Sequence, residues 1–80
     1  MRDLTARQRQ VLRMIAAGHT SGQIGTRLGI HRTTVDRHLG DIYRQLGAND
    51  RSHAVALAIY HGHITLADLS AIATNPRHDA

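Results

Sequence analysis

The fold of this chain is decided by residues 20–47, which read TSGQIGTRL (20–28), GIH (29–31) and RTTVDRHLGDIYRQLG (32–47). The first and last of these parts carry apolar residues at helical spacing, namely Ile24 and Leu28, then Val35, Leu39, Ile42 and Leu46. Thr20 and Gln23 form the capping-box pattern of a helix start, and Gly29 and Gly47 stand where helices end. The pattern therefore predicts a short helix between Thr20 and Gly29, a tight turn, and a longer helix over about 32–46. This order is typical of a helix-turn-helix.

Two further helices and a C-terminal extension flank this motif. Thr5 and Gln8 predict a helix over about 6–17 that ends at Gly18, and Asp50 predicts the start of another helix that runs to Gly62. A short fifth helix is expected from capping residues Thr65 and Asp68, apolar residues Leu66, Leu69 and Ile72, and a stop at Asn75-Pro76. We predict an all-α chain with a four-helix domain over 1–64, onto whose core Ile64 folds back. The extension, 65–80, is expected to be a short helix followed by a flexible tail.

The composition excludes several classes of protein. At 80 residues the chain is one small domain whose apolar side chains are needed for a single core, so a deep catalytic cleft is not expected. The sequence has no nucleophile and base at motif spacing and no glycine-rich phosphate loop after a strand, and we predict that it is not an enzyme. The absence of cysteine excludes disulfides and thiolate metal sites. Residues 1–4 lack the apolar run of a secretory signal or membrane span, which predicts a cytoplasmic protein without a membrane partner.

The charge balance favours a polyanionic partner. The chain has ten arginines and no lysine against six aspartates and no glutamate, a formal net charge of +4 and an isoelectric point near 11.1. Such a charge attracts nucleic acid, although an ordinary solvated surface has the same composition.

The outer face of the 32–46 helix is the candidate for reading bases. With the apolar strip against the core, the opposite face carries Thr33, Arg37, Gly40, Asp41 and Arg44. A helix fits the major groove of double-stranded DNA, and the guanidinium of Arg37 can bond both acceptors of a guanine. Gly40, one turn later, removes side-chain bulk and allows close approach. The alternative is that Arg37 pairs with Asp41 on a solvated helix face.

The ends of the same helix are the candidates for holding the DNA backbone. Thr33 and Thr34, together with the free amides of the first turn, suit phosphate. Arg32 and Arg44 lie near the two ends of the helix, where the backbone strands would pass.

The identities of the residues indicate more about the protein than their periodicity does. It contains LTARQRQVL (4–12), IAAG (15–18), Ile24, LGI (28–30), TV (34–35), HL (38–39), Ile42, LG (46–47) and RSHAVA (51–56). These residues, spread over four helices from Leu4 to Ile64, closely resemble the LuxR-type (GerE, NarL/FixJ-like) DNA-binding domain. The resemblance implies a helix-turn-helix transcription regulator that binds as a dimer to inverted or tandem half-sites, often with the fourth helix as the dimer contact. It implies dimer contacts at Ala54, Leu57, Ala58 and His61.

Several positions depart from the pattern of that family. The family often places lysines at the positions of Asp36, Gly40, Gln45 and Gly22, and glutamates at the positions of Gln8 and Gln10. Arg37 instead adds a basic group at a position that resembles a base-contacting site, while Thr34 and His38 match the family. The full predicted set of DNA contacts is Thr20, Ser21, Arg32, Thr33, Thr34, Arg37, His38, Gly40, Asp41 and Arg44. The resemblance therefore predicts DNA binding with modest affinity and an unusual target sequence.

The histidines do not predict a cofactor or metal site. His61 and His63 flank Gly62, and the spacing provides no third ligand for a tetrahedral metal. His31 stands at the start of the 32–46 helix, where serine is more usual in the family.

Three functions remain open. The first is a sequence-specific transcription regulator, either a detached output domain or a complete small protein. Met1 stands directly ahead of the domain and favours a complete small protein. The second is a regulator-like module that binds a related transcription factor or RNA polymerase, suggested by Asp36, Gly40 and Gln45. The third is a fragment resembling sigma-factor region 4, against which Leu46-Gly47 and residues 51–56 argue.

Overall fold

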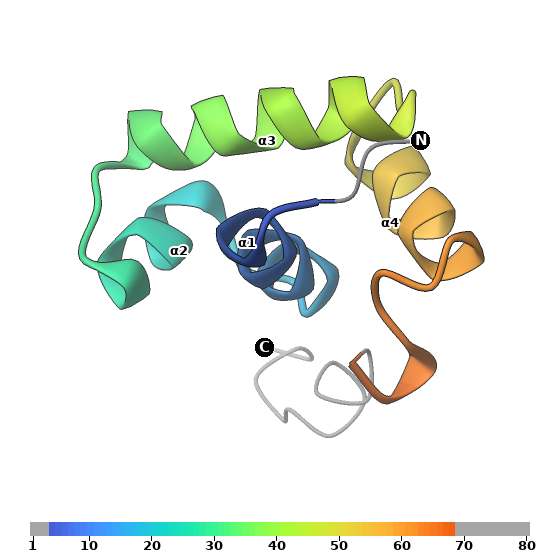
Figure 1. Cartoon of the computed structure of the whole chain (residues 1–80). Helices are drawn as coiled ribbons and strands as arrows, with labels where there is room; N and C mark the ends of the chain where they lie inside the picture. The colour runs from blue at the N-terminus through green and yellow to red at the C-terminus, as the bar shows by residue number, and fades with distance from the viewer. Residues whose placement is uncertain (1–3, 69–80) are drawn as a thin grey trace.

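The computed structural model describes residues 4–68, and all regular structure in this range is helical. Its helices are α1 (Ala6–Ala16), α2 (Ser21–Leu28), α3 (Arg32–Leu46) and α4 (Arg51–Tyr60). In Figure 1, α3 runs across one side of the molecule and α1 lies beneath its middle, with α2 under its first part and α4 near its last turn. The predicted all-α fold and its four main helices are confirmed. No helix in the described part of the chain has the length and apolar character needed to cross a bilayer.

Each helix begins at a polar side chain that caps its free amides. Thr5 and Thr20 each accept a hydrogen bond from the backbone N–H of the glutamine three residues later, and the side-chain oxygen of that glutamine accepts one from the backbone N–H of the capping residue. At α4, Asp50 accepts from the His53 backbone N–H at 2.9 Å, while Nδ1 of His53 accepts from the Asn49 N–H at 3.1 Å. The predicted caps are therefore confirmed, with a histidine in the second role at α4.

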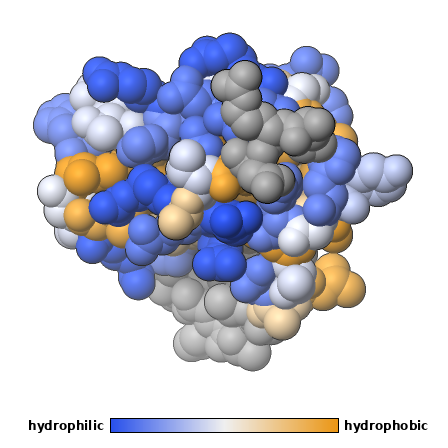
Figure 2. All heavy atoms as spheres, in the orientation of Figure 1, coloured by the Kyte–Doolittle hydropathy of each residue, from blue (hydrophilic) through white to orange (hydrophobic). Residues whose placement is uncertain are grey.

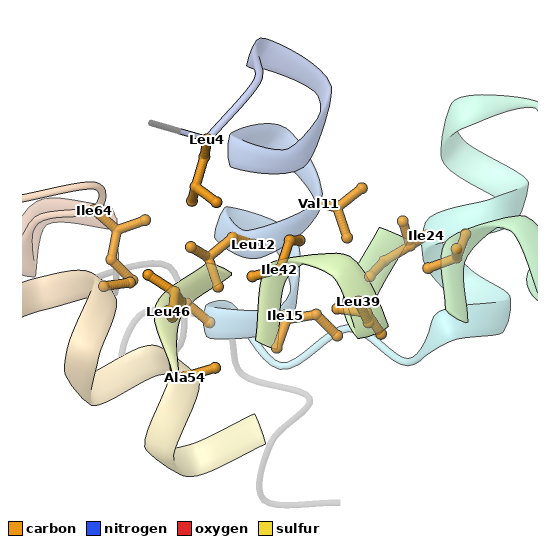
Figure 3. Packing of buried hydrophobic residues seen from close by; sticks show 13 residues of the cluster. Leu4, Val11, Leu12, Ile15, Ile24, Leu39, Ile42, Leu46, Ala54 and Ile64 are labelled. Carbon is orange, nitrogen blue, oxygen red and sulfur yellow. The ribbon is translucent and has the colours of Figure 1, made fainter. Parts of the chain in front are cut away.

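The core forms where the inner strip of α3 meets the other three helices. Its buried apolar residues are Leu4, Val11, Leu12, Ile15, Ala16, Ile24, Val35, Leu39, Ile42, Leu46, Ala54, Ala58 and Ile64. Figure 3 shows Leu12 and Ile42 between α1 and α3, with Ile24 at the α2 end of the cluster and Ile64 at the other. Ile64 is only 2% exposed, so it folds back onto the core as predicted. Burial of this strip fixes which face of α3 is left to solvent.

The turn between α2 and α3 depends on two glycines. Gly29 ends α2 in the left-handed conformation, with φ of 70°, where a side chain would be strained. Gly25 is needed for a different reason: a Cβ there would lie 2.7 Å from the backbone oxygen of Ile30. The Gly25 carbonyl in turn accepts the Ile30 N–H at 3.0 Å. The backbone of the turn thus packs directly on α2, a requirement that helical periodicity does not predict.

The start of the extension is tied to the domain. Residues 66–68 are helical, the Thr65 N–H donates to Asp68 Oδ2 at 2.8 Å, and the same oxygen lies 3.9 Å from Nε of Arg13 on α1. The capping role predicted for Thr65 and Asp68 is confirmed. Leu66 is 73% exposed. The predicted continuation through Leu69 and Ile72, the stop at Asn75-Pro76 and the flexible tail lie outside the described residues.

Candidate nucleic-acid interface

The outer face of α3 is a polar surface that no other described helix covers. Figure 1 shows this side of α3 without a neighbouring element, and Figure 2 shows that the same edge of the molecule is hydrophilic. Thr33, Arg37 and Arg44 are exposed along it, while Gly40 and Asp41 are half-buried. Arg32 is exposed at the start of α3, and His38 is half-buried on its flank. The structure therefore brings most of the predicted contacts of α3 onto one accessible helix face.

Arg37 stands free at the centre of this face. Within residues 4–68 its side chain has neither an ion pair nor a hydrogen bond, so its donors are available to a partner. The alternative that Arg37 pairs with Asp41 is wrong, because Asp41 binds Arg44 instead. Spacing alone does not decide between the two arginines, since residues three apart on a helix are neighbours as close as residues four apart.

Arg44 is held along the helix rather than extended from it. Its Nη2 donates to Asp41 Oδ1, and its Nη1 lies 3.7 Å from the place where a Cβ of Gly40 would stand. The Arg44 side chain is 74% exposed, and an exposed pair of this kind contributes at most about 1 kcal/mol. A phosphate can therefore replace Asp41 as the partner of Arg44 at small cost.

The start of α3 is capped by His31, which changes the expected role of the first turn. Nδ1 of His31 accepts from the Thr33 N–H at 3.1 Å and lies 2.9 Å from Thr33 Oγ1. The Thr34 N–H donates to the His31 carbonyl at 3.0 Å. The amides of Thr33 and Thr34 are thus occupied, and the expectation that they are free for phosphate is wrong. The Thr34 hydroxyl remains a candidate donor, whereas the Thr33 hydroxyl is engaged by Nδ1 of His31.

The start of α2 lies beside α3 and is linked to it by a side-chain hydrogen bond. Ser21 Oγ donates to Asp36 Oδ1 at 2.7 Å, across the two helices of the motif. Thr20 Oγ1 accepts from the Gln23 N–H at 3.1 Å, which leaves the hydroxyl hydrogen of Thr20 able to donate elsewhere. Of the two predicted α2 contacts, Thr20 therefore has a donor available, whereas the donor of Ser21 is engaged by Asp36.

Gln45 faces the interior of the domain rather than DNA. Its Nε2 donates to Oε1 of Gln8 on α1 at 3.3 Å, and Gln8 is itself only 8% exposed. Gln45 stands where the family often has lysine, and Gln8 where it often has glutamate. Gln8 and Gln45 therefore contact each other, and a neutral hydrogen bond takes the place of the ion pair that a glutamate and a lysine at these two positions could form. Gln45 consequently does not support the interpretation that DNA contacts have been lost.

The dimer contacts implied for α4 need a correction. Ala54 and Ala58 are both 0% exposed and belong to the core, so they present no surface to a second chain. Leu57 is half-buried against the core, and His61 is exposed. The outward side of α4 instead carries Ser52, Ala56 and Tyr60, which are all exposed and spaced four residues apart. The resemblance places the contact on α4 without showing which side of α4 packs on α3, so Ala54 and Ala58 were assigned wrongly.

The histidines near the end of α4 lie close together without forming a metal site. The ring centroids of His61 and His63 are 6.2 Å apart, and His61 packs edge-on against Tyr60 at 5.0 Å. Among residues 4–68 no group of three potential ligands is close enough to hold a metal ion.

These features define a helix-turn-helix domain with an exposed basic recognition helix. Residues 2–58 match the family described as GerE, bacterial regulatory proteins, luxR family. The chain belongs to this luxR family of bacterial regulatory proteins, and the resemblance drawn from the sequence is confirmed. Membership also decides against a fragment of a sigma factor.

Named relatives support this assignment over the helical domain. The probable transcriptional regulatory protein SgaR of Hyphomicrobium methylovorum is 46% identical over 59 residues, which are 74% of this chain and 28% of SgaR. The transcriptional activator protein BjaR1 of Bradyrhizobium diazoefficiens is 45% identical over 58 residues, 72% of this chain and 24% of BjaR1. The chain thus spans about a quarter of the length of these relatives. The solved structure of VqmA bound to DPO matches with a TM-score of 0.70 at 28% identity, over 82% of this chain and 34% of that one.

Proposed function

We propose that this protein binds double-stranded DNA at specific sequences, with α3 in the major groove, and thereby regulates transcription. The observation that carries the proposal is Arg37, whose exposed guanidinium has no partner within the described residues on the one face of α3 that the fold leaves uncovered. A guanidinium can donate two parallel bonds to O6 and N7 of guanine, the commonest specific contact in the major groove. We also propose that the protein contacts RNA polymerase and acts in the cytoplasm, where bacterial DNA lies.

The residues around Arg37 suit the DNA backbone. Arg32 and Arg44 stand at opposite ends of α3, and the hydroxyl of Thr20 lies at the start of α2. Contacts of this kind position a protein on the duplex without reading its sequence. The net charge of +4 supports such binding and predicts that it weakens as salt concentration rises.

The same proposal includes a homodimer on DNA. It is supported by the outward strip of α4, Ser52, Ala56 and Tyr60, with Leu57 at its edge; Tyr60 is 81% exposed although it is large and aromatic. Replacement of Tyr60 by aspartate should keep the chain monomeric without unfolding it, because the exposed side chain of Tyr60 is not packed in the core. Light scattering at rising protein concentration measures the change, and a wild-type chain that stays monomeric and protects single half-sites would contradict the dimer.

The experiment that tests the function is selection of the full chain on random duplexes, followed by sequencing and by binding titrations at several salt concentrations. We expect a motif that contains guanine and consists of two spaced half-sites. The logarithm of the binding constant should fall linearly with the logarithm of the salt concentration. Selection without any motif, together with retention of a transcription factor or a polymerase subunit in a pull-down, would contradict the proposal and favour a protein-binding module.

A further inference from the structure

The exposed side of α3 beside Arg37 carries a carboxylate that is held in place. Asp36 is exposed and directly precedes Arg37. Its Oδ1 accepts a hydrogen bond from the Ser21 hydroxyl at 2.7 Å. Its Oδ2 has no hydrogen-bond or ion-pair partner within residues 4–68. Gly40, one turn further along the same side, carries no side chain. The helix thus presents one acceptor, fixed by a bond from α2, beside the donor group of Arg37.

A carboxylate meets few suitable partners in the major groove. It is only an acceptor when ionised, and the groove offers donors only at the exocyclic amines of cytosine and adenine. Phosphates, guanine O6 and N7, and thymine O4 are all acceptors and repel it. The amine of adenine lies between two acceptors, N7 of the same base and O4 of the paired thymine, whereas the amine of cytosine has an acceptor on one side only, O6 of the paired guanine. A carboxylate on this side of α3 is therefore satisfied best by cytosine.

We propose that Asp36 is a second specificity-determining residue, which selects cytosine at the base pair next to the guanine read by Arg37. Ser21 acts as a positioning residue, because its hydroxyl holds one carboxylate oxygen and leaves the other to accept from the cytosine amine. This inference rests on the proposed DNA-binding function. It gives a reason for an acid on a binding face whose other charged residues are mostly arginines: Asp36 lowers affinity for wrong sequences more than for the right one.

The experiment compares motifs selected by the full-length wild type, Asp36→Asn, Asp36→Ala, Ser21→Ala and Asp68→Asn. We expect the wild type to prefer cytosine at that pair by about tenfold over guanine, the smaller end of the range for one base contact. Asp36→Asn should move the preference to adenine, because an amide can bond both N6 and N7. Asp36→Ala should abolish the preference, and Ser21→Ala should weaken it without changing the base. The guanine assigned to Arg37 should persist in all of these motifs.

Asp68→Asn is the matched control, because it removes one negative charge from the chain without touching α3 or the Ser21–Asp36 bond. It should tighten binding evenly across sequences and leave the cytosine preference unchanged. If Asp36→Asn and Asp36→Ala act in this even manner, with a steeper salt dependence and no altered base, Asp36 acts through charge alone and the inference is overturned while the proposed function stands. If the wild type selects no motif at all, the proposed function fails, and this inference with it.

Discussion

The two faces of α3 differ in what determines them. The inner face, Val35, Leu39, Ile42 and Leu46, is at most 7% exposed and packs on residues of the same chain. The outer face is centred on Arg37, which has no partner within the described residues. The inner residues must satisfy a core that the chain itself supplies, whereas the outer residues serve a partner that is not part of the chain. A change on the inner face should therefore alter stability, and a change on the outer face should alter binding.

The largest effect is expected on the inner face. Ile42→Ala should lower the free energy of unfolding by about 2–5 kcal/mol, because it removes a fully buried side chain and leaves a cavity between α1 and α3. Arg37→Ala should change it by less than about 0.5 kcal/mol, because the side chain is exposed and has no partner in the described part of the chain. Urea denaturation followed by circular dichroism measures both. Similar losses in the two variants would contradict the division between the faces.

The second prediction concerns the turn that sets the angle of α3. Gly25→Ala should cost about 1–3 kcal/mol, because the new Cβ meets the backbone oxygen of Ile30 and the turn must shift. Gly22→Ala is the matched control in the same helix: its Cβ would lie 3.9 Å from Thr20 Oγ1, an ordinary contact, and it should raise stability by about 0.5 kcal/mol. Thermal melts of the two variants test this. Equal and small changes would show that α2 tolerates a side chain against the turn.

The third prediction concerns the cap at the start of α3. His31→Ala should lower stability by about 1 kcal/mol, since the Thr33 N–H loses its acceptor, whereas His31→Ser should largely retain it. Denaturant midpoints of the two variants give the comparison. A loss of the same size in both would mean that the imidazole contributes through packing rather than as an acceptor.

The smallest effect is expected at Gln45. Gln45→Lys should leave the salt dependence of DNA binding unchanged, because residue 45 points to Gln8 on α1. Gly40→Lys, on the outer face, should steepen the slope of log affinity against log salt by about 0.9, as expected for one added phosphate contact. Fluorescence anisotropy at several salt concentrations distinguishes the two. A steeper slope with Gln45→Lys would show that this flank also reaches DNA.

The sequence predicted the parts of this structure that local rules decide. Helical spacing identified the inner strip of α3, and Thr5, Thr20 and Asp50 marked helix starts, because caps and amphipathic strips are set within a few residues. Contacts between helices were missed: Gly25 against Ile30, Gln8 with Gln45, and the burial of Ala54 and Ala58. These depend on how the helices are placed against one another, which periodicity does not specify.

The candidate site was predicted in its position and less well in its internal bonds. The outer face of α3 with Arg37 on it was expected, with a pair to Asp41 left open, whereas the pairing of Asp41 with Arg44 and the bond from Ser21 to Asp36 were not expected. On an exposed face several partners are equally close, and weak differences decide among them. Which base each residue contacts depends on the DNA, and it cannot be predicted from local patterns in the sequence.

The central claim is that Arg37 reads a guanine, and one thermodynamic cycle tests it most directly. The binding free energies of the wild type and Arg37→Ala are measured on the selected duplex and on the same duplex with that guanine–cytosine pair exchanged for adenine–thymine. We predict that the wild type discriminates between the duplexes by about 1–3 kcal/mol and that Arg37→Ala does not. Equal discrimination by both proteins, with an unchanged footprint, would contradict the claim.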